Sequence, residues 1–134
     1  MSTILWTILA LSLIILGFLL DLILDVLTLK SSKQKPDAEI EKYYSSSEII
    51  KSREYTWDKT MYSIISNSFF FIALLCFWYF RGFVILDDFL LSINLGEILT
   101  GTAFLGALSL LSAAASIPFN YYSTFYIEQK FGFN

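Results

Sequence analysis

The chain has 134 residues, of which 56% are hydrophobic and 16% are charged, and its formal net charge is −3. It contains no histidine and a single cysteine, which excludes a disulfide within the chain, a zinc site built from histidine and cysteine, and a catalytic triad with a histidine base. The negative net charge lacks the basic footprint of a nucleic-acid-binding protein, so we expect no nucleic-acid partner.

Three stretches without a charged residue divide the sequence, namely residues 1–20, 60–80 and 98–127. Each reaches the roughly 20 residues that an apolar helix needs to cross the hydrocarbon core of a bilayer. The sequence therefore predicts an all-α membrane protein, surrounded by lipid, with three transmembrane helices over about residues 3–29, 47–80 and 98–117.

The first predicted helix lacks the basic start of a cleaved signal peptide, and apolar residues continue beyond its core, so we expect it to be retained. Near its end Asp21 and Asp25 lie one helical turn apart on the same face. Two interpretations stay open: an acidic pair inside the membrane that faces a cavity, or a pair in the headgroup layer where the span ends.

Residues 30–59 form the polar part of the chain, with seven Lys or Arg and six Asp or Glu side chains. The composition of residues 30–36 predicts a loop. Ser45 followed three residues later by Glu48 fits a capping box, so the second helix is expected to begin a few turns outside the membrane. Because short cytoplasmic loops carry an excess of basic residues, we predict that this part is cytoplasmic, with the N-terminus outside and the C-terminus in the cytoplasm.

The last uncharged stretch is too long for one straight span. We expect Pro118 to divide it into a membrane helix, over about 98–117, and a separate segment that starts at the proline. The preceding connector, 81–97, mixes charged with apolar residues and is expected to lie along the membrane surface. Near the end of the chain, Gly132 predicts a helix end with a positive φ angle.

The third predicted helix carries small side chains at spacings of four and three, which form one continuous face: Thr102, Gly106, Ser109, Ala113 and Ser116. Small residues let helix backbones approach closely in lipid, so this face predicts a tightly packed neighbouring helix. A ligand groove along the same face is the alternative.

Two segments carry distinctive motifs. The first reads KSREYTWDK and fits the pattern KSRxYxxDK through Lys51, Ser52, Arg53, Tyr55, Asp58 and Lys59. The second, residues 117–134, fits the pattern LPFxxYxTFxIEEKxGFN through Pro118, Phe119, Tyr122, Thr124, Phe125, Ile127, Glu128, Lys130, Gly132, Phe133 and Asn134. Together they resemble the N-terminal membrane region of the CAAX prenyl protease 1 family, and Pro36-Asp37 is similar to a third element of that family. The chain departs from the pattern at Ile117 and Gln129, and it has Phe131 where some members of the family have a histidine.

The resemblance implies integral-membrane zinc metallopeptidases with about seven helices around a water-filled chamber. Their zinc is held by an HExxH helix and a further glutamate, which lie beyond the resembling region. We therefore predict no catalytic residue and no metal ligand in this chain, and expect zinc only in the complete family protein. On this interpretation the chain is a fragment that forms chamber wall and a cytoplasmic docking segment.

The expected partners are then the remaining helices and the catalytic domain of the complete peptidase. The expected location is the bacterial inner membrane, or the endoplasmic reticulum membrane if the source is eukaryotic. The alternative function is a stand-alone three-helix membrane protein that binds or scaffolds a partner.

Glu128 and Lys130 allow two interpretations. They orient a catalytic domain or a substrate at the mouth of the chamber, or they pair with charges such as Arg53 or Asp58 where the second and third helices end.

Overall fold

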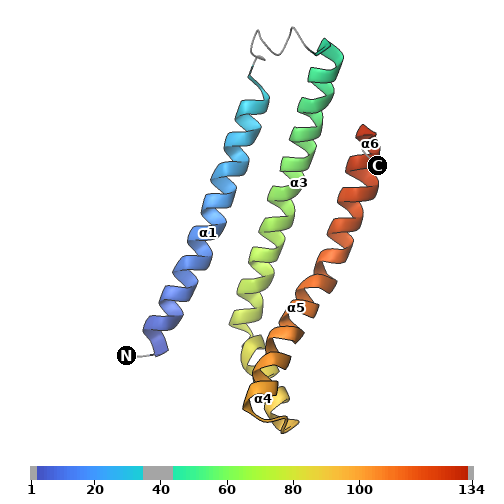
Figure 1. Cartoon of the computed structure of the whole chain (residues 1–134). Coiled ribbons are helices and arrows are strands. Elements are labelled where there is room, and N and C mark those ends of the chain that lie inside the picture. Colours follow the sequence, from blue (N-terminus) through green and yellow to red (C-terminus); the bar gives the residue numbers. More distant parts are fainter. Residues whose placement is uncertain (1–2, 35–43, 133–134) are drawn as a thin grey trace.

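The computed structural model describes residues 3–34 and 44–132, and every secondary-structure element in these two ranges is helical. The elements are α1 (Thr3–Ser32), α3 (Ser46–Tyr79), α4 (Gly82–Ser92), α5 (Glu97–Tyr122), a π-helical turn η1 (Ser123–Glu128) and α6 (Gln129–Phe131). Three of the helices are long and apolar enough to cross a membrane, in agreement with the predicted fold class. They run antiparallel to one another in sequence order, and the N-terminus and C-terminus lie at opposite ends (Figure 1).

Local sequence signals explain where α3 begins and ends. The Ser45 backbone amide donates to Oε2 of Glu48 at 2.9 Å, and the Glu48 amide donates back to the Ser45 hydroxyl, which completes the predicted capping box. At the other end Arg81 adopts a left-handed conformation with φ 59° and turns the chain into α4. A side chain at Gly82 would collide with the ring of Phe77, so this sharp turn requires a glycine.

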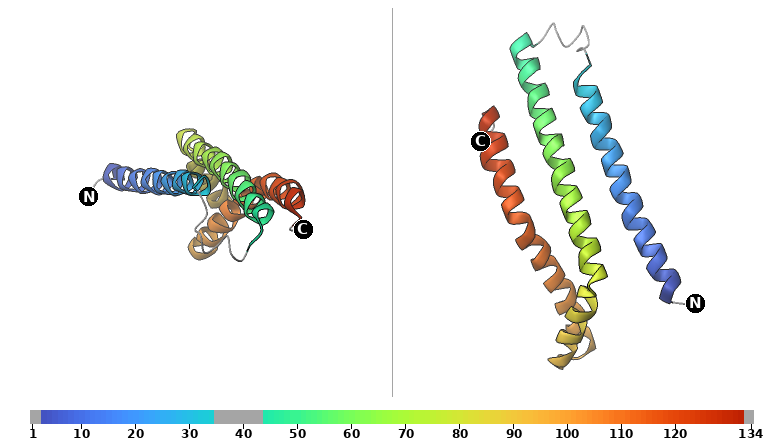
Figure 2. Two further views of the ribbon diagram at one scale, coloured as in Figure 1. Left: turned by 90° about the horizontal axis from the view of Figure 1, so that it is seen from above. Right: turned by 180° about the vertical axis from the view of Figure 1, so that it is seen from behind.

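The helix α3 is the central element, with α1 on one side and the C-terminal half of the chain on the other (Figure 2). The Phe18 ring stacks on the Phe71 ring, with centroids 4.1 Å apart. Closer to the polar end, the Lys33 ammonium lies 4.3 Å from the centre of the Trp57 ring. These contacts fix the antiparallel register of residues 18–33 against residues 57–71 of α3.

This register gives the position of the acidic pair of α1 along α3. Asp21 and Asp25 lie between the two contacts, alongside the uncharged part of α3 that starts at Thr60. Asp21 is exposed and Asp25 is half-buried. The depth of the pair in a membrane stays a prediction, and both interpretations remain open.

Two expectations about helix ends are wrong. The helix α1 continues to Ser32, so the predicted loop from residue 30 does not start there. Pro118 does not divide the third helix but lies inside α5, which continues to Tyr122 and then widens into η1. Proline removes one backbone donor, but neighbouring helices and local π adjustments satisfy the freed groups in membrane helices, so a proline there need not end the helix. The expected surface connector contains a helix of its own, α4.

Most large apolar side chains on the three long helices face outward. Only three apolar side chains are buried among the described residues, Leu90, Ile127 and Phe131. Such a surface would be unstable in water but suits hydrocarbon, and helices satisfy their own backbone groups there. The protein is thus a multi-pass integral membrane protein.

Candidate functional site

The two motif segments, more than 50 residues apart in the sequence, pack against each other at the polar end of α3. We call this contact the motif junction and define it as residues 51–62 of α3 against residues 117–132. Two ion pairs cross it. Lys130 Nζ lies 2.6 Å from Asp58 Oδ2, and Lys59 Nζ lies 3.7 Å from Glu128 Oε1. Of the two interpretations of Glu128 and Lys130, the structure therefore gives direct contacts for pairing with charged residues of the second helix.

Aromatic side chains form a second layer of the motif junction. The Tyr55 ring meets the Phe131 ring edge-on, with centroids 5.4 Å apart, and Phe131 is only 3% exposed. The Tyr62 ring stacks on the Tyr122 ring at 5.5 Å, and the Tyr62 hydroxyl donates a hydrogen bond to the backbone carbonyl of Phe119. This bond joins a side chain of α3 to the backbone of α5 next to Pro118.

Phe119 also extends the contact toward the centre of the membrane. Its ring lies 5.0 Å from those of both Phe69 and Phe70 on α3. Sequence reasoning did not single out Tyr62, Phe69 or Phe70. The only signal was an aromatic run in an apolar span, which is also what a lipid-facing surface would show.

The end of the junction depends on a glycine. Gly132 caps α6 with φ 71°, which confirms the predicted positive φ angle. A Cβ atom built there would lie 3.7 Å from Lys51 Nζ, so Lys51 closes the junction beside the cap. A residue with a side chain at this position would be strained by its backbone conformation alone.

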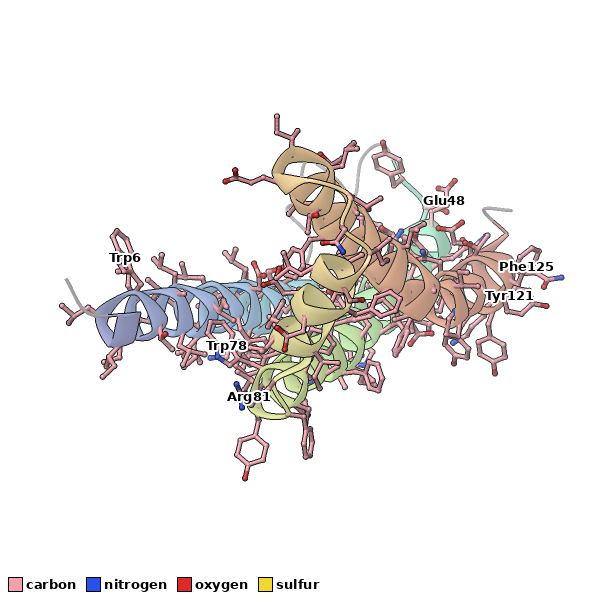
Figure 3. All side chains as sticks on the ribbon, turned by 90° about the horizontal axis from the view of Figure 1, so that it is seen from below. Trp6, Glu48, Trp78, Arg81, Tyr121 and Phe125 are labelled. Atoms are coloured by element: carbon pink, nitrogen blue, oxygen red, sulfur yellow. The ribbon has the colours of Figure 1, made fainter. Side chains whose placement is uncertain are left out.

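Not all of the motif residues meet at the junction. Phe125 is 52% exposed and its ring packs on that of its neighbour Tyr121, and both rings point away from the other helices (Figure 3). The Ser52 carbonyl accepts a hydrogen bond from Thr56 within α3, and Thr124 is half-buried in η1. Arg53 faces α1, where it donates to the Gln34 carbonyl.

Four of the predicted motif positions lie outside the described residues: Pro36, Asp37, Phe133 and Asn134.

The small-residue face of α5 has no neighbouring helix within the described residues. Thr102, Gly106, Ser109 and Ala113 are exposed, and a Cβ atom added at Gly106 meets nothing within 4 Å. The hydroxyls of Thr102 and Ser109 donate to carbonyls of their own helix. Ser116 is half-buried and bonds in the same way. A packed neighbour for this face stays a prediction.

The described residues do not bring together side chains that could act as ligands of a metal ion. In the described ranges no three His, Cys, Asp or Glu side chains are placed to hold one ion. The described residues therefore do not fit the zinc that the resemblance implies for the complete protein, and what they offer is charge pairing and packing.

Reversal of the charges at the junction tests whether the close ion pair holds it together. Asp58→Lys places a second ammonium beside that of Lys130, and Lys130→Asp places a second carboxylate beside that of Asp58. Since partly exposed ion pairs contribute about 0–1 kcal/mol, each single change is expected to accelerate hydrogen exchange of the η1 and α6 amides by up to about fivefold. The double reversal is expected to return exchange to the parent rate. If both singles and the double exchange alike, the pair contributes nothing to docking.

The comparisons with known proteins agree with one family. The sequence model of a family described as "CAAX prenyl protease N-terminal, five membrane helices" matches residues 25–134. "Probable CAAX prenyl protease 1" of Schizosaccharomyces pombe is 30% identical over 115 residues, which cover 76% of this chain and 24% of the yeast protein. "CAAX prenyl protease 1 homolog" of Mus musculus is 34% identical over 104 residues, which cover 72% of this chain and 22% of the mouse protein. The chain thus spans about a quarter of the length of these relatives. No solved structure matches it.

Proposed function

Because the chain belongs to the CAAX prenyl protease N-terminal family, we propose that it forms part of the wall of an intramembrane chamber and carries a docking segment for the rest of such a protease. The observation that carries this proposal is the motif junction. It holds residues 117–132 against α3 through the Asp58–Lys130 ion pair and the buried Phe131 ring. A segment fixed in this way offers a defined position for whatever packs on it.

The reaction of the complete protein is proposed from the names of the relatives. It would be hydrolysis of a peptide bond, with zinc as the expected metal, in proteins that end in a prenylated CAAX sequence. A zinc peptidase of this type needs two histidines one turn apart and a glutamate that activates water. This chain contains no histidine, so we propose that those groups belong to other parts of the complete protein.

A peptidase assay tests where the catalyst lies. The purified chain with added zinc is expected to leave a prenylated CAAX peptide intact, because its carboxylates are not grouped for metal binding in the described ranges. A preparation from cells that carry the empty vector serves as the background. Chelator-sensitive turnover above that background would place catalytic groups in this chain and overturn the proposal.

We also propose an orientation in which the polar end of α3 is cytoplasmic. The supporting observation is the excess of basic residues, since seven of the nine Lys and Arg lie in residues 30–59. The other end, with α4, carries Asp87, Asp88 and a single basic residue, Arg81.

Cysteine labelling in intact cells tests this orientation. Tyr44→Cys and Asp88→Cys are exposed positions at opposite ends, and each is introduced in a Cys76→Ser background. An impermeant thiol reagent is expected to label the cysteine at position 88 and not the one at position 44. The opposite pattern would reverse the assignment.

A further inference from the structure

An open cavity of about 430 Å³ lies at the polar end of the helices, where the end of α1, the first turns of α3 and Lys130 come together. Its walls include three cationic side chains, Lys33, Arg53 and Lys130, and two carboxylates, Glu54 and Asp58. The motif junction uses only one cation of these, because Lys130 is paired with Asp58.

The other two cations have no carboxylate partner within the described residues. The Lys33 ammonium rests over the Trp57 ring, and Arg53 uses one of its guanidinium donors on the Gln34 carbonyl. A guanidinium has five N–H donors in a planar fork that matches the oxygens of a phosphate. The cavity therefore presents two positively charged side chains with hydrogen-bond donors to spare, one from the turn after α1 and one from α3.

The depth of the cavity corresponds to the headgroup layer. Trp57 lies in its wall, and the uncharged stretch of α3 begins three residues later at Thr60. Tryptophan is enriched at this layer because its ring is amphipathic. The surrounding basic stretch, residues 30–59, also favours anionic lipids at the same surface.

A second hollow continues from the cavity toward the apolar part of the bundle. It has a volume of about 250 Å³ and shares Asp58 and Lys130 with the cavity. Its remaining walls are mainly apolar or aromatic and include Met61, Ile65 and Ile127. A cationic cavity at the surface followed by an apolar groove matches the order of groups in a phospholipid, and a free anion would have no use for the groove.

From these observations we infer that the cavity binds an anionic phospholipid. Arg53 and Lys33 contact the phosphate, Trp57 forms the wall beside it, and an acyl chain lies in the groove beyond Lys130. The inference depends on the chain being in a membrane and holds independently of the proposed role in a protease.

Tryptophan fluorescence provides a direct readout. The chain has three tryptophans, and Trp6→Phe with Trp78→Phe leaves Trp57 as the sole reporter. In phosphatidylcholine nanodiscs, brominated phosphatidylglycerol is expected to quench Trp57 at mole fractions too low for random contact. Brominated phosphatidylcholine at the same fractions is expected to quench far less.

Single substitutions separate a site from general surface charge. Because hydrogen bonds to charged groups are stronger than those between neutral groups, Arg53→Gln is expected to lower the preference for phosphatidylglycerol about tenfold or more. Arg53→Lys keeps the charge, loses the fork and should recover only part of the preference. Lys30→Gln, a matched loss of charge outside the cavity, is expected to change it less than about threefold.

Three results would overturn the inference. Equal losses in Arg53→Gln and Lys30→Gln would show surface attraction without a site. Full preference in Arg53→Gln would show that the cavity does not hold the phosphate. Displacement of the lipid by inorganic phosphate at millimolar concentration would identify a free anion as the ligand. Circular dichroism of each variant confirms that the helices are retained.

Discussion

Phe131→Ala is expected to release the C-terminal segment from α3. The ring is 3% exposed and meets Tyr55 edge-on, so its removal leaves a cavity at the centre of the motif junction. Truncation of a buried phenylalanine typically costs about 3–5 kcal/mol. Since the segment can open without unfolding the rest of the chain, this loss should appear as local opening. Hydrogen exchange of the amides in η1 and α6 is expected to accelerate about 100-fold or more, with little change in α1.

The matched control for this prediction is Phe125→Ala. It removes the same side chain from the same segment, but Phe125 is 52% exposed and its ring contact is with Tyr121 of the same helical stretch rather than with α3. Exchange in η1 and α6 is expected to change by only a few-fold. Equal acceleration in the two variants would mean that the segment is not held by the contact between Tyr55 and Phe131.

Gly106→Leu is expected to have opposite effects in this chain and in the full-length protease to which we propose it belongs. In the chain alone, an added side chain meets nothing within 4 Å, and leucine forms helices better than glycine by up to about 1 kcal/mol. The variant should therefore melt at the same temperature or slightly higher. In the full-length protein a neighbouring helix is expected on this face, and overpacking there typically costs about 1–3 kcal/mol.

Gly101→Leu is the matched control. It makes the same change in the same helix, but Gly101 is not one of the residues of the small-residue face. A Cβ atom added at Gly101 also meets nothing within 4 Å. Thermal unfolding in detergent is expected to show a lower melting temperature only for Gly106→Leu in the full-length protein. If the two variants have the same melting temperature in the chain alone and also in the full-length protein, the small-residue face is exposed to lipid and the predicted neighbouring helix is absent.

The features that the sequence predicted correctly are set by local chemistry. The Ser45–Glu48 box is complete within four residues, and Gly132 reports its own backbone conformation. The three spans follow from the length of the uncharged stretches, which is a property of the bilayer. None of these features depends on which residues meet across the bundle.

The wrong expectation at Pro118 came from a rule for helices in water. There the lost hydrogen bond and the steric clash usually end or kink a helix. In this chain the helix continues to Tyr122. The hydrogen bond from the Tyr62 hydroxyl to the Phe119 carbonyl lies beside the proline and is separate from the bond that the proline removes, whose acceptor would be the Ala114 carbonyl. The bond from Tyr62 comes from a residue 57 positions away, so no local pattern could have predicted it.

The motif junction was only partly predictable. The sequence identified both motif segments and left Asp58 and Arg53 open as partners for the charges after Pro118. The structure pairs Lys130 with Asp58, whereas Arg53 faces α1. Charge type alone cannot choose between two residues five positions apart, because they lie on different faces of a helix. The contacts of Phe119 with Phe69 and Phe70 on α3 could not be predicted for a related reason. Aromatic residues are equally suited to contact with lipid and to contact with another helix.

Cross-linking between positions 58 and 130 tests the motif junction most directly. Asp58→Cys and Lys130→Cys are combined in a Cys76→Ser background and treated in native membranes with a short bifunctional thiol reagent. The side chains at these positions are in contact, so we expect rapid intramolecular cross-linking. The control pair is Ser52→Cys with Lys130→Cys. Ser52 lies on a different face of α3 from Asp58, so this pair should be cross-linked slowly. Rapid reaction of the control pair with slow reaction of the 58–130 pair would show that residues 117–132 do not dock on α3 as described.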